Sequence, residues 1–321
     1  MAHPRLTSYL GRSRLAPSGQ VALAAGVEWY DQHLALEQLD KRTVAIGEPR
    51  YYQQNVSYLI SGTARAVIYD TGTGLADTPG AVNALAKGPV VATCSHQHYD
   101  HVGNLDRFDE VWLLDLPQYR RAVRNELLRP PLRLHLGPLE AMPRPVFRVS
   151  KWLPDGAMID LGGRQLRVLH LPGHTVDGMA LHDESADQLF VGDFLYPGGA
   201  YAFTPTGNLA DYTASAARLL ELTSATTQIF VAHPGRVPVF SAPRMTRRDL
   251  DDLWAGLRDA QARPNSAKGL LLRSYPAGSQ LSILARAPWA RPSRQVNWVG
   301  RRRPQLTPPT RYPERRAAAK G

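Results

Sequence analysis

The sequence has few of the features that mark several large protein classes. It contains one cysteine, Cys94, so it cannot form an internal disulfide. No apolar run approaches the roughly 18–20 residues that a membrane-spanning helix needs. The G-x-S-x-G turn that presents a nucleophilic serine is also absent. These absences argue against a disulfide-stabilised secreted domain, a membrane-spanning protein and a serine hydrolase of that type.

Residues 1–20 are expected to form a loose leader. Arg5, Arg12 and Arg14 precede the apolar stretch 21–25, but this stretch is too short and too close to Glu28 for a typical secretion signal. A lone cysteine also fits a reducing compartment. We therefore predict a cytoplasmic protein without a membrane span.

Acidic residues are scarce at the other end of the chain. Residues 286–321 hold nine arginines, one lysine and a single acid, Glu314, and so supply +9 of the formal net charge of +10. This composition, also rich in proline, buries too little apolar surface to order itself. We expect a disordered basic tail that does not define the chemistry. Contact with nucleic acid is the alternative, because Trp289 and Trp298 lie among the arginines.

The main signal is the internal segment 93–101, TCSHQHYDH, which follows an apolar run with the length and β-branched content of a buried strand. Neutral imidazoles and carboxylates bind divalent metals. Two residues apart in an extended chain, His96 and His98 point the same way and can hold one ion. Asp100 and His101 follow the bend and can face a second ion. Two ions sharing an oxygen form the arrangement of the two-metal hydrolases.

Four other apolar segments with the pattern of a strand each end at a histidine or an aspartate, which can bind a metal or hydrogen-bond to a metal ligand. Glycine or Pro-Gly turn signals adjoin each of them. One such residue alone is weak evidence, because a histidine at a strand end is more often a satisfied core or turn residue. Together they predict that distant strand ends converge on the 96–101 cluster. The four residues are Asp70, His174, Asp193 and His233.

The order of these residues along the chain resembles that of the five motifs of the metallo-β-lactamase-fold hydrolases, over roughly residues 40–240. That order is Asp70, the 96–101 cluster, His174, Asp193 and His233. The resemblance implies an α/β (α+β) fold, a four-layer αββα sandwich with a binuclear site at one edge. One ion would be held by His96, His98 and His174, and the other by Asp100, His101 and His233. Asp193 would bridge both ions, and Asp70 would orient the ligand loop by hydrogen bonds. Such donors suit zinc, with iron or manganese as alternatives.

Particular positions separate the branches of this family. Histidine at position 98 disfavours a flavodiiron protein, and no β-CASP-like insert follows Asp193, which counts against the nucleases. Tyr196 resembles the tyrosine that polarises the acyl oxygen in acyl-homoserine lactonases. A closer similarity, to the acyl-CoA thioesterase (palmitoyl-CoA hydrolase) branch, is carried by segments 48–55, 70–74, 163–166, 181–183 and 211–222.

We therefore predict a binuclear metal-dependent hydrolase. A metal-bridging hydroxide would attack the carbonyl of a small acyl substrate, which is a thioester, a lactone or an ester. We also consider that this substrate is anionic, as a derivative of coenzyme A is. Asp100 would accept the water's proton, and Tyr196 would help to stabilise the oxyanion. The alternatives are a phosphodiester or nucleic-acid hydrolase and a β-lactamase-like hydrolase of the same fold. A complete ligand set argues against a non-catalytic scaffold.

The catalytic domain is expected to span residues 21–285. Within it, residues 115–150 hold six prolines and seven arginines against three acids, and we interpret them as an insert near the active site, helical at 117–128. Its arginines could bind the phosphates of coenzyme A, although a solvated surface is the alternative. Outer helices are expected at 77–87, 209–222 and 246–261, and terminal strands at 269–272 and 280–284.

Overall fold

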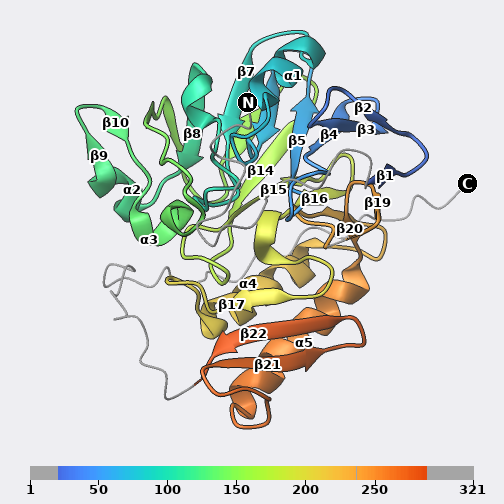
Figure 1. Cartoon of the computed structure of the whole chain (residues 1–321), viewed down its shortest axis with the longest axis vertical. Coiled ribbons are helices and arrows are strands. Elements are labelled where there is room, and N and C mark those ends of the chain that lie inside the picture. Colours follow the sequence, from blue (N-terminus) through green and yellow to red (C-terminus); the bar gives the residue numbers. More distant parts are fainter. Residues whose placement is uncertain (1–20, 236, 288–321) are drawn as a thin grey trace, which may run out of the picture.

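The computed structural model describes residues 21–235 and 237–287, so the predicted leader and nearly all of the basic tail lie outside the described residues. Two mixed β-sheets pack face to face, with helices on the outside (Figure 1). The αββα architecture expected from the sequence is therefore confirmed.

The first sheet has eight strands in the order β12-β8-β7-β6-β5-β4-β3-β2. The pairs β6–β7, β7–β8 and β8–β12 are parallel, and the others are antiparallel. In chain order the strands are β2 (Val27–Trp29), β3 (Ala35–Asp40), β4 (Thr43–Gly47), β5 (Val56–Ser61), β6 (Ala66–Tyr69), β7 (Val90–Thr93), β8 (Glu110–Leu114) and β12 (Lys151–Leu153).

The second sheet has six strands in the order β13-β14-β15-β16-β18-β20. Only β16 and β18 pair in parallel among these strands. Its strands are β13 (Met158–Asp160), β14 (Gln165–His170), β15 (Met179–Asp183), β16 (Gln188–Phe190), β18 (Gln228–Phe230) and β20 (Arg244–Met245).

Aromatic side chains fill the space between the sheets. Phe190 and Phe230 stack with ring centroids 5.1 Å apart, and Tyr58 lies against both. The buried phenols are satisfied across the interface, because the hydroxyl of Tyr58 donates to the carbonyl of Val231 at 2.6 Å and that of Tyr69 to Met179 at 2.5 Å. These two bonds tie the first sheet to segments that end beside the predicted metal ligands.

A second apolar cluster covers the outer face of the second sheet. Its side chains come from the second sheet, from two helices and from a small three-stranded sheet. The helices are α4 (Leu209–Leu222) and α5 (Arg247–Ala262), and the strands of the small sheet are β17 (Ala200–Ala202), β22 (Leu281–Arg286) and β21 (Leu272–Ala277). Thr246 and Asp249 form a capping box that starts α5. The helices predicted at 209–222 and 246–261 are confirmed, as is the one predicted at 77–87, which is α1 (Thr78–Leu85). A further parallel pair joins β1 (Ala22–Leu23) to β19 (Val239–Phe240).

Residues 115–150 connect β8 to its parallel neighbour β12, a crossover that needs a long connection. The helix expected at 117–128 is wrong beyond residue 122. Asn125 and Glu126 both adopt positive φ, the backbone of a two-residue hairpin turn, and the chain reverses there. The elements are α2 (Pro117–Ala122), β9 (Val123–Arg124), β10 (Leu127–Leu128), α3 (Leu132–His135), the 3₁₀ turn Gly137–Glu140 and β11 (Phe147–Arg148).

The terminal strand expected at 269–272 also differs, since β21 begins only at Leu272. Gly269 has a φ of +115°, and Lys268 pairs with Ser274, so the chain reverses over 269–271. The strand expected at 280–284 is confirmed as β22. Within the described residues, no helix combines the length and the apolar character needed to cross a bilayer.

The end of the sandwich that holds β13 and the β3–β4 turn contains a buried ionic network. Arg164 donates from Nε to Asp183 at 2.5 Å and from Nη2 to Gln188 at 2.9 Å, and Gln188 donates to Asp40 at 2.7 Å. Arg164 and Asp183 are both buried. Removing one partner would leave a buried charge without compensation.

We expect Asp183→Ala to lower the free energy of unfolding by about 3–5 kcal/mol. Glu184→Ala is the matched control, because its pair with Arg167 is solvent-exposed and such pairs contribute about 0–1 kcal/mol. Urea denaturation of both variants measures the difference. Equal losses in the two variants would contradict a stabilising role for the buried network.

Candidate metal centre

The loop that follows β7 is held by one carboxylate. Asp70 comes directly after β6, at a φ of +66°, and accepts the backbone N–H of Ser95 at 2.6 Å and its hydroxyl at 2.9 Å. The same carboxylate lies 2.9 Å from Nδ1 of His101. Asp70 therefore contacts the loop that carries the candidate ligands without entering the ligand cluster itself.

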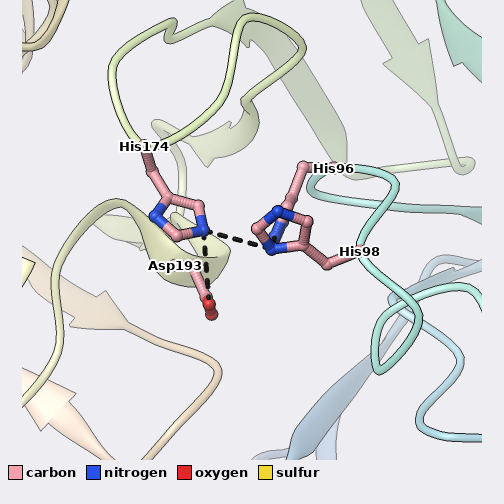
Figure 2. Close-up of side chains that lie close together, drawn as sticks. All are labelled: His96, His98, His174 and Asp193. Carbon is pink, nitrogen blue, oxygen red and sulfur yellow. Dashed lines mark hydrogen bonds and ion pairs between the residues drawn. The ribbon is translucent and has the colours of Figure 1, made fainter. Parts of the chain in front are cut away.

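The first candidate ligand group consists of four buried side chains that point toward one another (Figure 2). Nδ1 of His98 lies 2.7 Å from Nε2 of His96 and 3.3 Å from Nε2 of His174. Oδ2 of Asp193 lies 3.7 Å from Nε2 of His174. Three imidazoles and a carboxylate thus present one donor atom each to a common point.

The second group adjoins the first and contains Asp100, His101 and His233. Oδ2 of Asp100 lies 3.6 Å from Nε2 of His101 and 3.5 Å from Nε2 of His233. The other oxygen of Asp193, Oδ1, lies 3.4 Å and 3.1 Å from these two nitrogens. Asp193 therefore turns one oxygen toward each group, which is the geometry that a bridging carboxylate requires.

These side chains come from strand ends that meet at one edge of the sandwich. The 96–101 loop follows β7, His174 follows β14, Asp193 stands in the 3₁₀ turn after β16, and His233 follows β18. Gly192 is needed beside Asp193, because its φ is +57° and a Cβ there would lie 2.5 Å from the hydroxyl of Ser95. All seven predicted ligands are brought together, and none is more than 8% exposed.

The electrostatics divide the imidazoles into two kinds. Burial, together with the charges of neighbouring histidines, lowers the pKa of His96 and His98 well below its usual range. Burial also lowers the pKa of His174. Against the effect of burial, the carboxylates of Asp100, Asp70 and Asp193 raise the pKa of His101. The first three rings are therefore neutral, the form that binds a metal.

Orphaned polar atoms indicate that a cation fits here. Nε2 of His101, Nε2 of His233 and Oδ1 of Asp193 are buried and face one another, yet none of them makes a well-aligned hydrogen bond in the described part of the chain. Buried polar atoms are normally satisfied, and exceptions call for an unseen partner such as an ion. The donor set of imidazole nitrogens and carboxylate oxygens is one that divalent cations accept. The residues present thus fit two adjacent metal ions.

Bonds from outside the cluster fix the orientation of the rings. Nδ1 of His174 lies 2.8 Å from the carbonyl of Tyr201, and Nδ1 of His233 lies 3.1 Å from the carbonyl of Gln53. Such contacts select the tautomer that leaves Nε2 for a metal. The side-chain amide of Asn55 donates to Oδ2 of Asp100 at 3.1 Å. The segment 48–55 therefore supports the site, a role that its family-like sequence did not reveal by itself.

Asp177 is a supporting residue that sequence reasoning missed. Its Oδ2 accepts the backbone N–H of Gln97 at 3.0 Å and the hydroxyl of Tyr119. One buried carboxylate thus links the His174 loop, the 96–101 loop and helix α2. A signal existed, since Asp177 stands three residues after His174, but an aspartate in a turn has many ordinary uses.

Tyr196 is buried beside the centre, with its ring centroid 5.7 Å from that of His233. Burial and the charge of Asp193 raise the pKa of its hydroxyl, so the phenol keeps its proton and can donate.

Other histidines lie outside the cluster. Nε2 of His170 bonds to the carbonyl of Val176, and His182 is buried in β15.

Comparison with known proteins agrees with this geometry. The family model of the metallo-beta-lactamase superfamily matches residues 50–233. The chain belongs to this superfamily. It is 30% identical to the acyl-coenzyme A thioesterase MBLAC2 of Homo sapiens over 70% of this chain and 86% of the relative. It is 31% identical to the MBLAC2 of Gallus gallus over 59% of this chain and 75% of that one.

A solved structure shows the same fold. The metallo-beta-lactamase from Pontibacter korlensis superposes with a TM-score of 0.52 at 16% identity, over 71% of this chain and all of that one. The family match and the two groups of candidate metal ligands make this superfamily member a metal-dependent hydrolase. The family resemblance read from the motifs is therefore confirmed.

We expect the purified protein to contain about two divalent ions per chain. His233→Ala removes a donor from the second group only, so the metal content should fall toward one ion. Elemental analysis after dialysis measures both values and identifies the metal. His182→Ala is the control, since it removes a buried histidine outside the cluster. Equal metal content in His233→Ala and the native protein would contradict the predicted second site.

Asp177→Ala should weaken metal binding by roughly 10- to 100-fold, because the two ligand loops lose their shared acceptor. Competition with a chromophoric chelator measures the affinity. Tyr119→Phe is the matched variant, since it removes one donor but leaves the carboxylate for Gln97, and we expect a smaller effect. An unchanged affinity in Asp177→Ala would show that the link does not support the site.

Proposed function

We propose that this protein is a binuclear metal-dependent acyl-CoA thioesterase, with its catalytic domain over residues 21–285. The observation that carries the proposal is the complete pair of ligand groups at one sandwich edge. The relatives that align over most of their length and are named acyl-coenzyme A thioesterases support the acyl-CoA substrate. Cations bound here, with zinc as the first choice, would supply Lewis acidity and lower the pKa of a coordinated water.

The ligand roles follow the geometry of the two groups. His96, His98 and His174 would hold one ion, and Asp100, His101 and His233 the other, with Asp193 between them. Asp70 would keep the proton of His101 on Nδ1, at 2.9 Å, so that Nε2 stays available. Asn55 would hold Oδ2 of Asp100 in place, at 3.1 Å.

The remaining steps belong to side chains of this chain. Asp100 would take the proton of the attacking water at Oδ1, because Oδ2 is already engaged by Asn55. The protonated hydroxyl of Tyr196 would donate to the oxygen of the acyl carbonyl as negative charge develops there. When the carbonyl re-forms, the C–S bond would break, and Asp100 would return the proton that it took to the departing CoA thiolate. Burial of the ligands excludes bulk water, which strengthens both interactions.

The positive charge of the crossover 115–150 supports the proposal that the substrate is anionic. It carries seven arginines against three acids. Two pairs are internal, since Arg120 binds Asp115 through two nitrogens and Arg148 binds Glu126. The segment still has an excess of positive charge, which would attract the phosphates of coenzyme A. Its backbone joins the 96–101 loop, because the N–H of Tyr99 donates to the carbonyl of His135 at 2.8 Å.

A lactone is the second candidate substrate. The observation that favours it is the place of Tyr196, whose ring centroid lies 5.7 Å from that of His233 in the second ligand group. A phenol in this position can polarise the acyl oxygen of a lactone as well as that of a thioester.

A substrate panel tests the proposal. Decanoyl-CoA, an acyl-homoserine lactone, nitrocefin and bis-p-nitrophenyl phosphate are offered to the metal-loaded protein, and product is followed by absorbance or chromatography. We expect turnover of the thioester at the highest kcat/KM. Asp100→Ala, purified identically, should lose at least roughly 100-fold. Turnover of the phosphodiester alone would overturn the proposal.

A further inference from the structure

One buried imidazole outside the seven candidate ligands lies beside the metal centre. His135 ends α3 in the β8–β12 crossover and is fully buried. Its carbonyl oxygen accepts the N–H of Tyr99, which stands between His98 and Asp100. The ring centroids of His135 and Tyr99 lie 6.5 Å apart. The crossover therefore delivers this imidazole to the loop that carries the ligands.

The hydrogen bonds of His135 define its tautomer. Nδ1 accepts the backbone N–H of Gly137 at 3.1 Å, so Nε2 carries the proton of the neutral ring. Burial and the charge of Arg144 lower the pKa of His135 to about 4, which keeps the ring neutral at pH 7. A Cβ at Gly137 would lie 2.4 Å from Nδ1. Glycine thus lets the backbone close on one edge of the ring.

The N–H of Nε2 has no hydrogen-bond partner within residues 21–235 and 237–287. A buried donor without an acceptor costs about 1–3 kcal/mol, and native proteins rarely leave one unused. The backbone bond from Tyr99 holds this residue against the loop that carries His98 and Asp100, one residue of each ligand group. A buried, uncharged donor therefore stands beside the ligand loop.

We propose that Nε2–H of His135 is a substrate-binding donor for a carbonyl oxygen of the acyl-CoA, an inference that rests on the proposed thioesterase function. A neutral N–H suits an uncharged carbonyl, whereas a phosphate is better matched by arginine. An acyl-CoA offers carbonyl oxygens at the thioester and at the amides of its pantetheine arm. The same hydrogen bond serves either of them.

Binding of two non-hydrolysable ligands separates these sources. S-(2-oxodecyl)-CoA keeps a carbonyl near the position of the thioester, and S-decyl-CoA lacks it, while both keep the pantetheine amides. Calorimetry measures their affinities for native protein, His135→Leu and His135→Gln, whose side-chain amide restores an N–H. His182→Leu is the matched control, because His182 is buried, its Nδ1 also has no partner among the described residues, and it lies about 10 Å along β15 from Met179.

We expect His135→Leu to weaken binding about tenfold, the loss of one neutral hydrogen bond, with His135→Gln close to native and the metal content unchanged. Weaker binding of the ketone alone assigns the donor to the reacting carbonyl, and weaker binding of both ligands assigns it to the pantetheine arm. Unchanged binding of both ligands would overturn the inference. So would a loss that His182→Leu reproduces, or one that follows loss of metal. Turnover of decanoyl-CoA by the native protein is scored separately and tests the proposed function itself.

Discussion

The structure depends on the burial of charged and polar side chains at one sandwich edge. Seven candidate ligands, none more than 8% exposed, bring two carboxylates and five imidazoles within a few ångströms of one another. Taking a carboxylate out of water costs several kcal/mol unless an opposite charge compensates it. Burial lowers the pKa of His96, His98 and His174, whereas against the effect of burial the nearby carboxylates raise the pKa of His101 and His233. Divalent cations would satisfy the carboxylates and the neutral rings together.

The distances in this cluster are set by packing elsewhere in the sandwich. Tyr58 and Tyr69 reach across the aromatic core to carbonyls of the second sheet, one of them directly before the Ala232–His233 segment and the other at the start of β15. Asp70 and Asp177 then hold the ligand loop by accepting the backbone N–H groups of Ser95 and Gln97. Hydrogen bonds from outside the cluster orient His101, His174, His233 and Asp100, which is what a metal site needs in order to be preorganised.

The sequence was most informative for ligands that are neighbours in the chain or that directly follow an apolar strand. His96, His98, Asp100 and His101 are neighbours in the chain, and Asp70, His174, Asp193 and His233 follow apolar strands, so the cluster and the sandwich could both be predicted. Asp177, Asn55 and His135 could not, because their partners lie 80, 45 and 36 residues away in the chain and their residue types are common in turns. The helix expected at 117–128 failed for a local reason, since a two-residue turn at Asn125 and Glu126 outweighed helix propensity.

The crossover between β8 and β12 has both of its ends fixed in adjacent strands of one sheet. Away from Tyr119 and His135, which bond to the ligand loops, its length and composition can therefore change during evolution without moving the strand ends. On the proposed function, the metal ligands and the contacts to the anionic part of the substrate would come from separate stretches of the chain. In such a design, exchange of one loop-rich connector would change the substrate while the metal ligands stay in place.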